Sequence, residues 1–154
     1  GDNGSGAWFG MQLLHHVLLN KDGLAPDTLL THLLCAEIAV HNTLDIVSHF
    51  MHATPTTYAK FAPMVFTAAE QGDAVALGIV KQGAAFINQI ALKLFELSPP
   101  RFSMIGGLAY KLVPYLDKQV QQALTPALAA PEFGAVWFAR QQQSLLPAAA
   151  AAQS

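Results

Sequence analysis

The feature that most constrains the fold of this chain is an unbroken helical repeat between Gly72-Asp73 and Ser98-Pro99-Pro100. A spacing of three or four positions places side chains on one face of an α-helix. Glycine can end the preceding helix, aspartate can cap the next one, and the prolines terminate it. We therefore predict one long helix with a stripe along its whole length and a close helix crossing at Gly83. The stripe consists of Val75, Ile79, Gly83, Phe86, Ile90, Leu94 and Leu97.

The same periodicity predicts helices over most of the chain, with one strand candidate late in the sequence. Residues 102–105 form the best strand, which ends at Gly106-Gly107, and residues 125–130 are a weaker candidate for another. A strand, a double-glycine turn and a helix make half of a βαβ unit, and ligands of open α/β sheets bind beyond the carboxyl ends of such strands. The predicted helices cover residues 7–19, 26–38, 57–71, 113–124 and 131–140, with a short one starting at 42 or 43.

Composition narrows the class of protein. The 154 residues suffice for one domain with a core, and 53% hydrophobic against 12% charged residues suggests that further apolar surface is buried against a partner domain or subunit. The net charge of −2 argues against nucleic-acid binding. The sequence contains no run of about twenty uncharged apolar residues, so we predict no membrane span. The single cysteine, Cys35, forbids an internal disulfide and favours a cytoplasmic location.

The opening ten residues are the first candidate site. Four glycines stand there with Asp2, Asn3 and Ser5, directly before a helical pattern. Glycine allows a ligand to approach the backbone closely, and the start of a helix offers unpaired N–H groups to an anion or a polar ligand. A structural linker has a similar composition, so spacing alone leaves both interpretations open.

Three stretches resemble one known family. Residues 1–8 (GDNGSGAW) look like the GD-x-GSG-x-W segment of the family that groups N-acetylglucosamine and glucosamine kinases with BadF/BadG-type ATPases, within the sugar kinase–actin superfamily. Residues 61–73 are similar to its FAP-x-VF…AA-x-x-GD junction, and residues 104–109 (MIGGLA) to its adenosine-motif strand and double-glycine turn. The stretches lie in family order.

The resemblance implies a fold and a domain organisation. Residues 1–146 would be the C-terminal domain of a two-domain kinase or ATPase, followed by an alanine-rich tail at 147–154. The fold class implied is helix-rich α/β, a ribonuclease-H-like (actin-like ATPase) domain that lacks its first strands. The family's N-terminal half carries a phosphate loop and an aspartate general base. Neither is present, so no catalytic residue is assigned in this chain.

The resemblance also implies which residues bind the substrates. Asp2 would accept a hydrogen bond from the sugar, and Gly4, Ser5 and Gly6 would offer amides to the sugar or the terminal phosphate. The alternative for Asp2 is a helix cap. Asn3 replaces the glutamate commoner in the family, which leaves a metal-related role for it in doubt.

The nucleotide side is implied at Ala59 and at Gly106, Gly107 and Leu108. Two glycines at a strand end leave backbone bare for adenine or ribose, although a plain tight turn has the same sequence. Lys60 is either a phosphate ligand or, as we favour, a solvated surface residue. The six histidines show no zinc pattern, so we predict no metal site.

The function implied is an ATP-dependent kinase that phosphorylates glucosamine or N-acetylglucosamine at the 6-hydroxyl, with ATP and Mg²⁺. Its partners would be the amino sugar and its own N-terminal domain, without nucleic acid or membrane; a homodimer is left open, and the fragment alone should be inactive. One alternative is an ATPase activator of a radical dehydratase or reductase, which the single Cys35 disfavours. Another is a non-enzymatic α-rich interaction domain.

Overall fold

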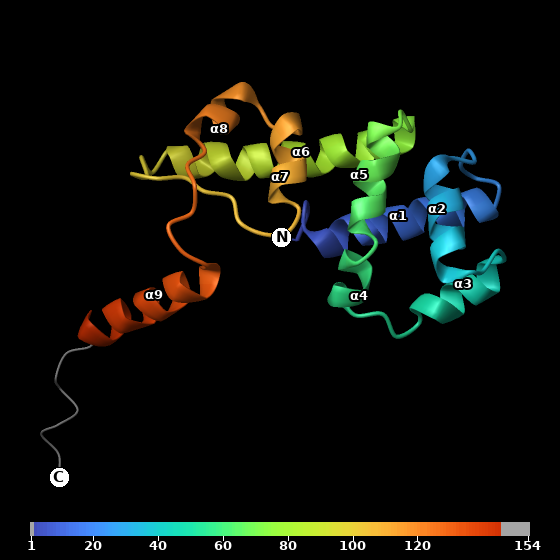
Figure 1. The fold of residues 1–154 in the computed structure, drawn as a ribbon, viewed down its shortest axis with the longest axis horizontal. Coiled ribbons are helices and arrows are strands. Elements are labelled where there is room, and N and C mark those ends of the chain that lie inside the picture. Colours follow the sequence, from blue (N-terminus) through green and yellow to red (C-terminus); the bar gives the residue numbers. More distant parts are fainter. Residues whose placement is uncertain (1, 146–154) are drawn as a thin grey trace, which may run out of the picture.

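In the computed structural model, which describes residues 2–145, the chain is helix-rich, as the sequence predicts (Figure 1). The long helices α1 and α6 run along the body, and α9 extends away from it (Figure 1). The elements are α1 (Gly6–Lys21), α2 (Leu29–Ile38), α3 (Thr43–Phe50), α4 (Pro55–Ala59), α5 (Ala62–Glu70), α6 (Ala74–Phe95), α7 (Ala109–Leu112), the 3-10 turn η1 (Val113–Tyr115), α8 (Lys118–Ala123) and α9 (Pro131–Leu145).

The core lies where α1, α2, α5 and α6 meet. Phe9 of α1 and Phe66 of α5 are fully buried, with ring centroids 5.0 Å apart. Two glycines allow the helices to approach this closely. A Cβ at Gly10 would lie 1.9 Å from the backbone oxygen of Tyr58, and one at Gly83 would lie 2.5 Å from Cζ of Phe9. The close helix crossing predicted at Gly83 is confirmed.

Asp73 joins the starts of two helices. Its Oδ1 accepts the N–H groups of Val75 and Ala76 at 2.9 and 3.0 Å, which confirms the predicted cap of α6. Its Oδ2 accepts the N–H of Leu30 at 3.3 Å, in the first turn of α2. One carboxylate therefore satisfies amides at two helix N-termini, which would otherwise lack partners.

The long helix α6 is confirmed, but its predicted stripe is buried only in the first half. Ile79 and Gly83 are buried, whereas Ile90, Leu94 and Leu97 are exposed. The second half turns a different side inward because it packs against α8 and η1 instead of α5. Asn88 is buried on that side, where its Oδ1 accepts the N–H of Asp117 at 3.1 Å.

Two predicted helices are each broken by a proline. The helix expected over 57–71 is divided into α4 and α5, and Pro63 lies in the first turn of α5. The helix expected over 113–124 is divided around Pro114, which lies in η1. Proline has no N–H to donate to the preceding turn of a helix. At both places the chain therefore starts a new helix with the proline in its first turn, where that donor is not needed.

The strands predicted at 102–105 and 125–130 are wrong for the described residues. Only one isolated parallel bridge forms, between Phe102 and Leu124, and the N–H of Thr125 donates to the oxygen of Phe102 at 2.7 Å. Two short segments paired only with each other cannot extend into a sheet, and Pro126 removes the next donor. The ribonuclease-H-like sheet stays a prediction.

Helix α6 is also, by length and composition alone, long and apolar enough to cross a membrane, and it is the one such helix in the described part of the chain. It carries Lys81 and Lys93. Its first half packs against α5 and α1 as a core helix does.

Candidate functional site

A cavity of about 450 Å³ lies between the opening loop and the turn after residue 105. Segments about one hundred residues apart in the sequence meet there, together with α4 and the middle of α6. Seven of the eight predicted binding residues line it, and Asp2 does not. The lining residues are Gly4, Ser5, Gly6, Ala59, Pro63, Ile87, Met104, Ile105, Gly106, Gly107, Leu108, Ala109 and Leu112.

The opening loop enters α1 through Ser5. The Ser5 hydroxyl accepts the N–H of Trp8 at 3.1 Å, and the Ser5 N–H donates to the oxygen of Asp2 at 3.0 Å. Ser5, and not Asp2, is therefore the cap of α1, so the alternative role of Asp2 as a cap is wrong. The N–H groups of Gly6 and Ala7 have no acceptor among the described residues. They are donors at the positive end of a 16-residue helix.

The same loop is wedged between two helices. Gly4 has φ +82°, and a Cβ there would lie 3.2 Å from the oxygen of Gly83 and from Ile87. A Cβ at Gly6 would lie 3.2 Å from that of Ala59. Close packing therefore explains why both positions are glycine, and both bring backbone without a side chain to the cavity.

The double-glycine turn is less crowded. Gly106 has φ +120°, which favours glycine, and it accepts the N–H of Ala109 at 3.2 Å as in a tight turn. A Cβ at Gly106 or Gly107 would meet nothing within 4 Å. Gly107 has neither a positive φ nor a crowding neighbour, so turn geometry does not explain its missing side chain.

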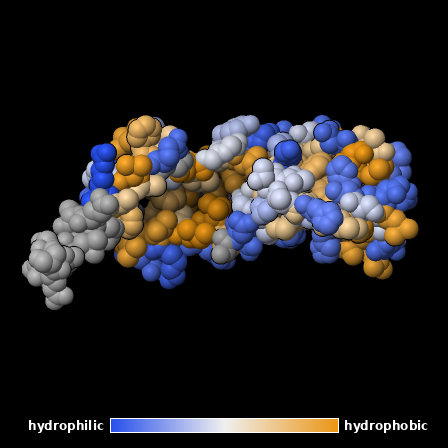
Figure 2. Space-filling model, turned by 90° about the horizontal axis from the view of Figure 1, so that it is seen from below, coloured by the Kyte–Doolittle hydropathy of each residue, from blue (hydrophilic) through white to orange (hydrophobic). Residues whose placement is uncertain are grey.

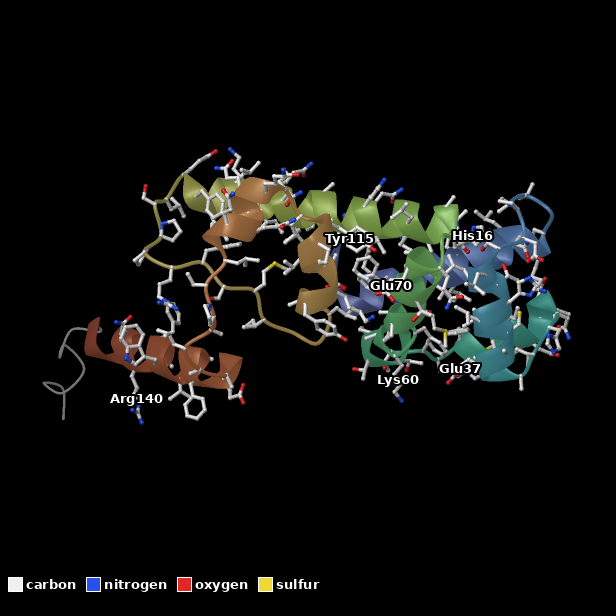
Figure 3. The ribbon with its side chains drawn as sticks, turned by 45° about the horizontal axis from the view of Figure 1, so that its top comes forward. His16, Glu37, Lys60, Glu70, Tyr115 and Arg140 are labelled. Atoms are coloured by element: carbon white, nitrogen blue, oxygen red, sulfur yellow. The ribbon has the colours of Figure 1, made fainter. Side chains whose placement is uncertain are left out.

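The cavity wall is apolar and carries no ionisable side chain. Hydrophobic side chains gather between α9 and the opening loop on the face drawn in Figure 2. Lys60 is exposed and does not line the cavity, as predicted for a solvated lysine (Figure 3). The wall therefore suits an uncharged ring system, whereas an anionic group would depend on backbone amides.

Six lining residues were not among the predicted binding residues. Met104, Ile105 and Ala109 lie in the family-like stretch 104–109, and the other three are Pro63, Ile87 and Leu112. Pro63 lies inside the family-like stretch 61–66, which was a usable signal. Ile87 and Leu112 look like ordinary helix residues. Only the crossing of α6 behind the opening loop and the placement of α7 bring them to the cavity.

The histidines do not form a metal centre in the described range, where no three histidine, cysteine or acidic side chains converge. His15 is exposed and His16 is buried. The His16 ring is 3.2 Å from the Thr28 hydroxyl. Burial lowers the pKa of His16, with a smaller lowering from His15, and the nearby Asp73 and Asp27 oppose the shift only in part.

For Asp73, hydrogen bonds outweigh the effect of burial on the pKa, whereas for His16 burial dominates. Burial acts to raise the pKa of its carboxyl, but hydrogen bonds from the amides of Ala76, Leu30 and Val75 and from Thr28 together lower it. Asp73 lies away from the cavity, so its role is structural.

Comparison with known proteins gives consistent results. A glucosamine kinase of Vibrio cholerae is 33% identical over 138 residues, which is 90% of this chain and 47% of that protein. An N-acetyl-D-glucosamine kinase of Dictyostelium discoideum is 33% identical over 116 residues, which is 70% of this chain and 36% of that protein. The crystal structure of a candidate N-acetylglucosamine kinase from Chromobacterium violaceum superposes with a TM-score of 0.74 at 26% identity, over 81% of this chain and 43% of that one.

The chain thus spans less than half the length of each of these relatives. A model of the BadF/BadG/BcrA/BcrD ATPase family matches residues 1–139, which contain every lining residue of the cavity. This chain belongs to the BadF/BadG/BcrA/BcrD ATPase family.

Proposed function

We propose that this chain is the C-terminal half of an ATP-dependent kinase that phosphorylates glucosamine or N-acetylglucosamine at the 6-hydroxyl. The observation that carries the proposal is the single cavity formed by Gly4–Gly6, Ala59 and Gly106–Leu108. The names of two relatives support the amino-sugar class of substrate.

In this proposal the turn at Gly106 and Gly107 receives adenosine. Bare backbone there allows base or ribose to lie against the main chain, and Met104, Ile105 and Leu108 supply apolar contact. The free amides of Gly6 and Ala7 at the start of α1 bind the phosphate or the sugar. Asp2, which is exposed, accepts a hydrogen bond from a sugar hydroxyl.

Magnesium fits this half of the site poorly. Mg²⁺ prefers carboxylate, phosphate and water oxygens, and no carboxylate lines the cavity. We assign no metal ligand in this chain. The general base likewise belongs to the other half of the protein, so residues 1–146 alone should be inactive.

The exposed apolar surface of α9 supports the proposed second half. Phe133, Trp137 and Phe138 are each at least 60% exposed. Monomeric proteins rarely leave such a patch uncovered, and docking of the missing domain would bury it. The alternative activator ATPase has less support because Cys35 is buried and is the one cysteine of the chain.

A coupled phosphorylation assay of the full-length parent with glucosamine and N-acetylglucosamine tests the proposal. Asp2→Ala should lower kcat/KM for the preferred sugar roughly ten- to hundredfold, because a charged hydrogen bond to the sugar is lost. Asp22→Ala, at the exposed end of α1, is the control. A wild-type rate for Asp2→Ala would remove Asp2 from the site, and absence of phosphorylation of either sugar by the parent would reject the proposed reaction.

A further inference from the structure

Lys111 makes an ion pair that differs from the Lys93–Glu96 and His32–Asp27 pairs. Lys93–Glu96 and His32–Asp27 join near neighbours in sequence, and all four of their side chains are more than half exposed. Lys111 and Glu70 are 41 positions apart, and the Lys111 side chain is only 22% exposed. This pair therefore connects two separate elements, α7 and the last residue of α5.

The Lys111 side chain lies across buried aromatic surface before it reaches Glu70. Its Nζ is 3.3 Å from Oε1 of Glu70 and 6.0 Å from the ring centroid of Phe66, which is fully buried. It also lies 5.8 Å from the centroid of Tyr110. Glu70 projects from α5 between the two elements (Figure 3). Solvent is partly excluded from Lys111, which reduces screening on its side of the pair, whereas Glu70 is 57% exposed.

The rim of the cavity has few other anchors, because Leu112 is the one buried residue of α7. Helix α7 has four residues, too few to be stable alone, and no side chain packs where a Cβ of Gly106 or Gly107 would stand. The N–H groups of Lys111 and Leu112 both donate to the oxygen of Leu108 at 3.1 Å. Whatever fixes Lys111 therefore fixes Leu108, which lines the cavity.

We infer that the Lys111–Glu70 pair positions the Gly106–Leu108 turn for its nucleotide ligand. Neither residue lines the cavity, so both are positioning residues. The inference rests on the proposed function, because that function identifies the turn as the nucleotide side. Loss of the pair would leave the turn in its binding conformation for a smaller fraction of the time and would weaken nucleotide binding by that fraction.

Variants of the full-length parent test this inference: Lys111→Met, which keeps the apolar stem, Glu70→Gln, and the exchanged pair E70K/K111E. Lys93→Met removes an equivalent but exposed ion pair and is the matched control. We expect faster amide hydrogen exchange at residues 106–112 in Lys111→Met and Glu70→Gln. We also expect KM for ATP to rise about three- to tenfold with KM for the sugar unchanged. The exchanged pair should recover part of both losses.

Unchanged amide exchange at residues 106–112 in both single variants would overturn the inference. So would faster exchange with an unchanged KM for ATP, since the pair would then stabilise the turn without serving the nucleotide. If the unaltered parent shows no saturable dependence on ATP, the proposed function fails. In that case the nucleotide role of the pair fails with it, and the exchange data decide separately whether the pair orders the turn.

Discussion

Gly10 and Gly83 lie where helices cross, and Gly106 and Gly107 lie where a turn borders the cavity. At the first two positions a Cβ would overlap the backbone of Tyr58 or the ring of Phe9. At the other two it would meet open space. The helical body thus requires glycine for packing, whereas at Gly107 packing gives no reason for it. Gly10 and Gly83 therefore serve the fold, whereas the adenosine site proposed above would give Gly107 a reason that packing does not.

Among the variants that test this comparison, Gly10→Ala should have the largest effect. The new Cβ would lie 1.9 Å from the oxygen of Tyr58, which belongs to backbone and cannot rotate away. We expect a loss of more than about 4 kcal/mol in the free energy of unfolding of the full-length parent, measured by denaturant titration. Gly78→Ala in α6 is the control, because its Cβ meets nothing within 4 Å and should stabilise by about 0.5–1 kcal/mol. A mild effect of Gly10→Ala would show that α1 and α4 can separate.

Asp73→Ala should come next in size. It removes acceptors for amides of both α6 and α2, so we expect a loss of about 1–3 kcal/mol in unfolding free energy and no change in KM for ATP. Asp117 offers a matched control, since it precedes α8 but makes no side-chain cap bond. Asp117→Ala should cost much less. Equal losses from the two variants would argue against the double cap.

Gly107→Val probes the cavity rim. The side chain would extend into open space, so the free energy of unfolding should stay within about 0.5 kcal/mol of the wild type. It should raise KM for ATP roughly tenfold by occupying the surface proposed for adenosine, with Gly107→Ala intermediate. Steady-state kinetics with varied ATP measures this. Unchanged ATP dependence would remove the turn from the nucleotide site and leave Gly107 unexplained.

The smallest expected effect is a change in how the free energy of unfolding depends on pH, through His16 in α1. Burial lowers the pKa of His16 below 6.5, so the folded state binds fewer protons than the unfolded one. Stability should therefore fall as pH drops below about 6.5, and the lowered pKa of Asp73 adds a further loss below about 4. His16→Gln should flatten the dependence between about pH 7 and 5 in equilibrium unfolding, with no change in KM for ATP. An equally steep profile in the variant would assign the dependence to other groups.

The sequence by itself determined the helical content, the long α6 and its Asp73 cap, because these depend on periodicity and on contacts within a few residues. It also determined the family, through stretches 1–8, 61–73 and 104–109, and the resemblance indicated seven residues that the structure brings to one cavity. Whether they bind ligands stays a prediction. The breaks at Pro63 and Pro114 follow from proline chemistry, but the prediction relied on the apolar repeat and therefore placed one continuous helix at each site.

Only the tertiary structure decided which side of α6 faces inward after Gly83, since periodicity cannot say which partner a helix meets. It likewise decided that residues 102–105 form a single bridge, because a strand requires neighbours that local sequence does not specify. The Lys111–Glu70 pair and the place of Ile87 in the cavity wall depend on residues far apart in the chain. Contacts of that kind follow from how helices pack, which no single stretch of sequence encodes.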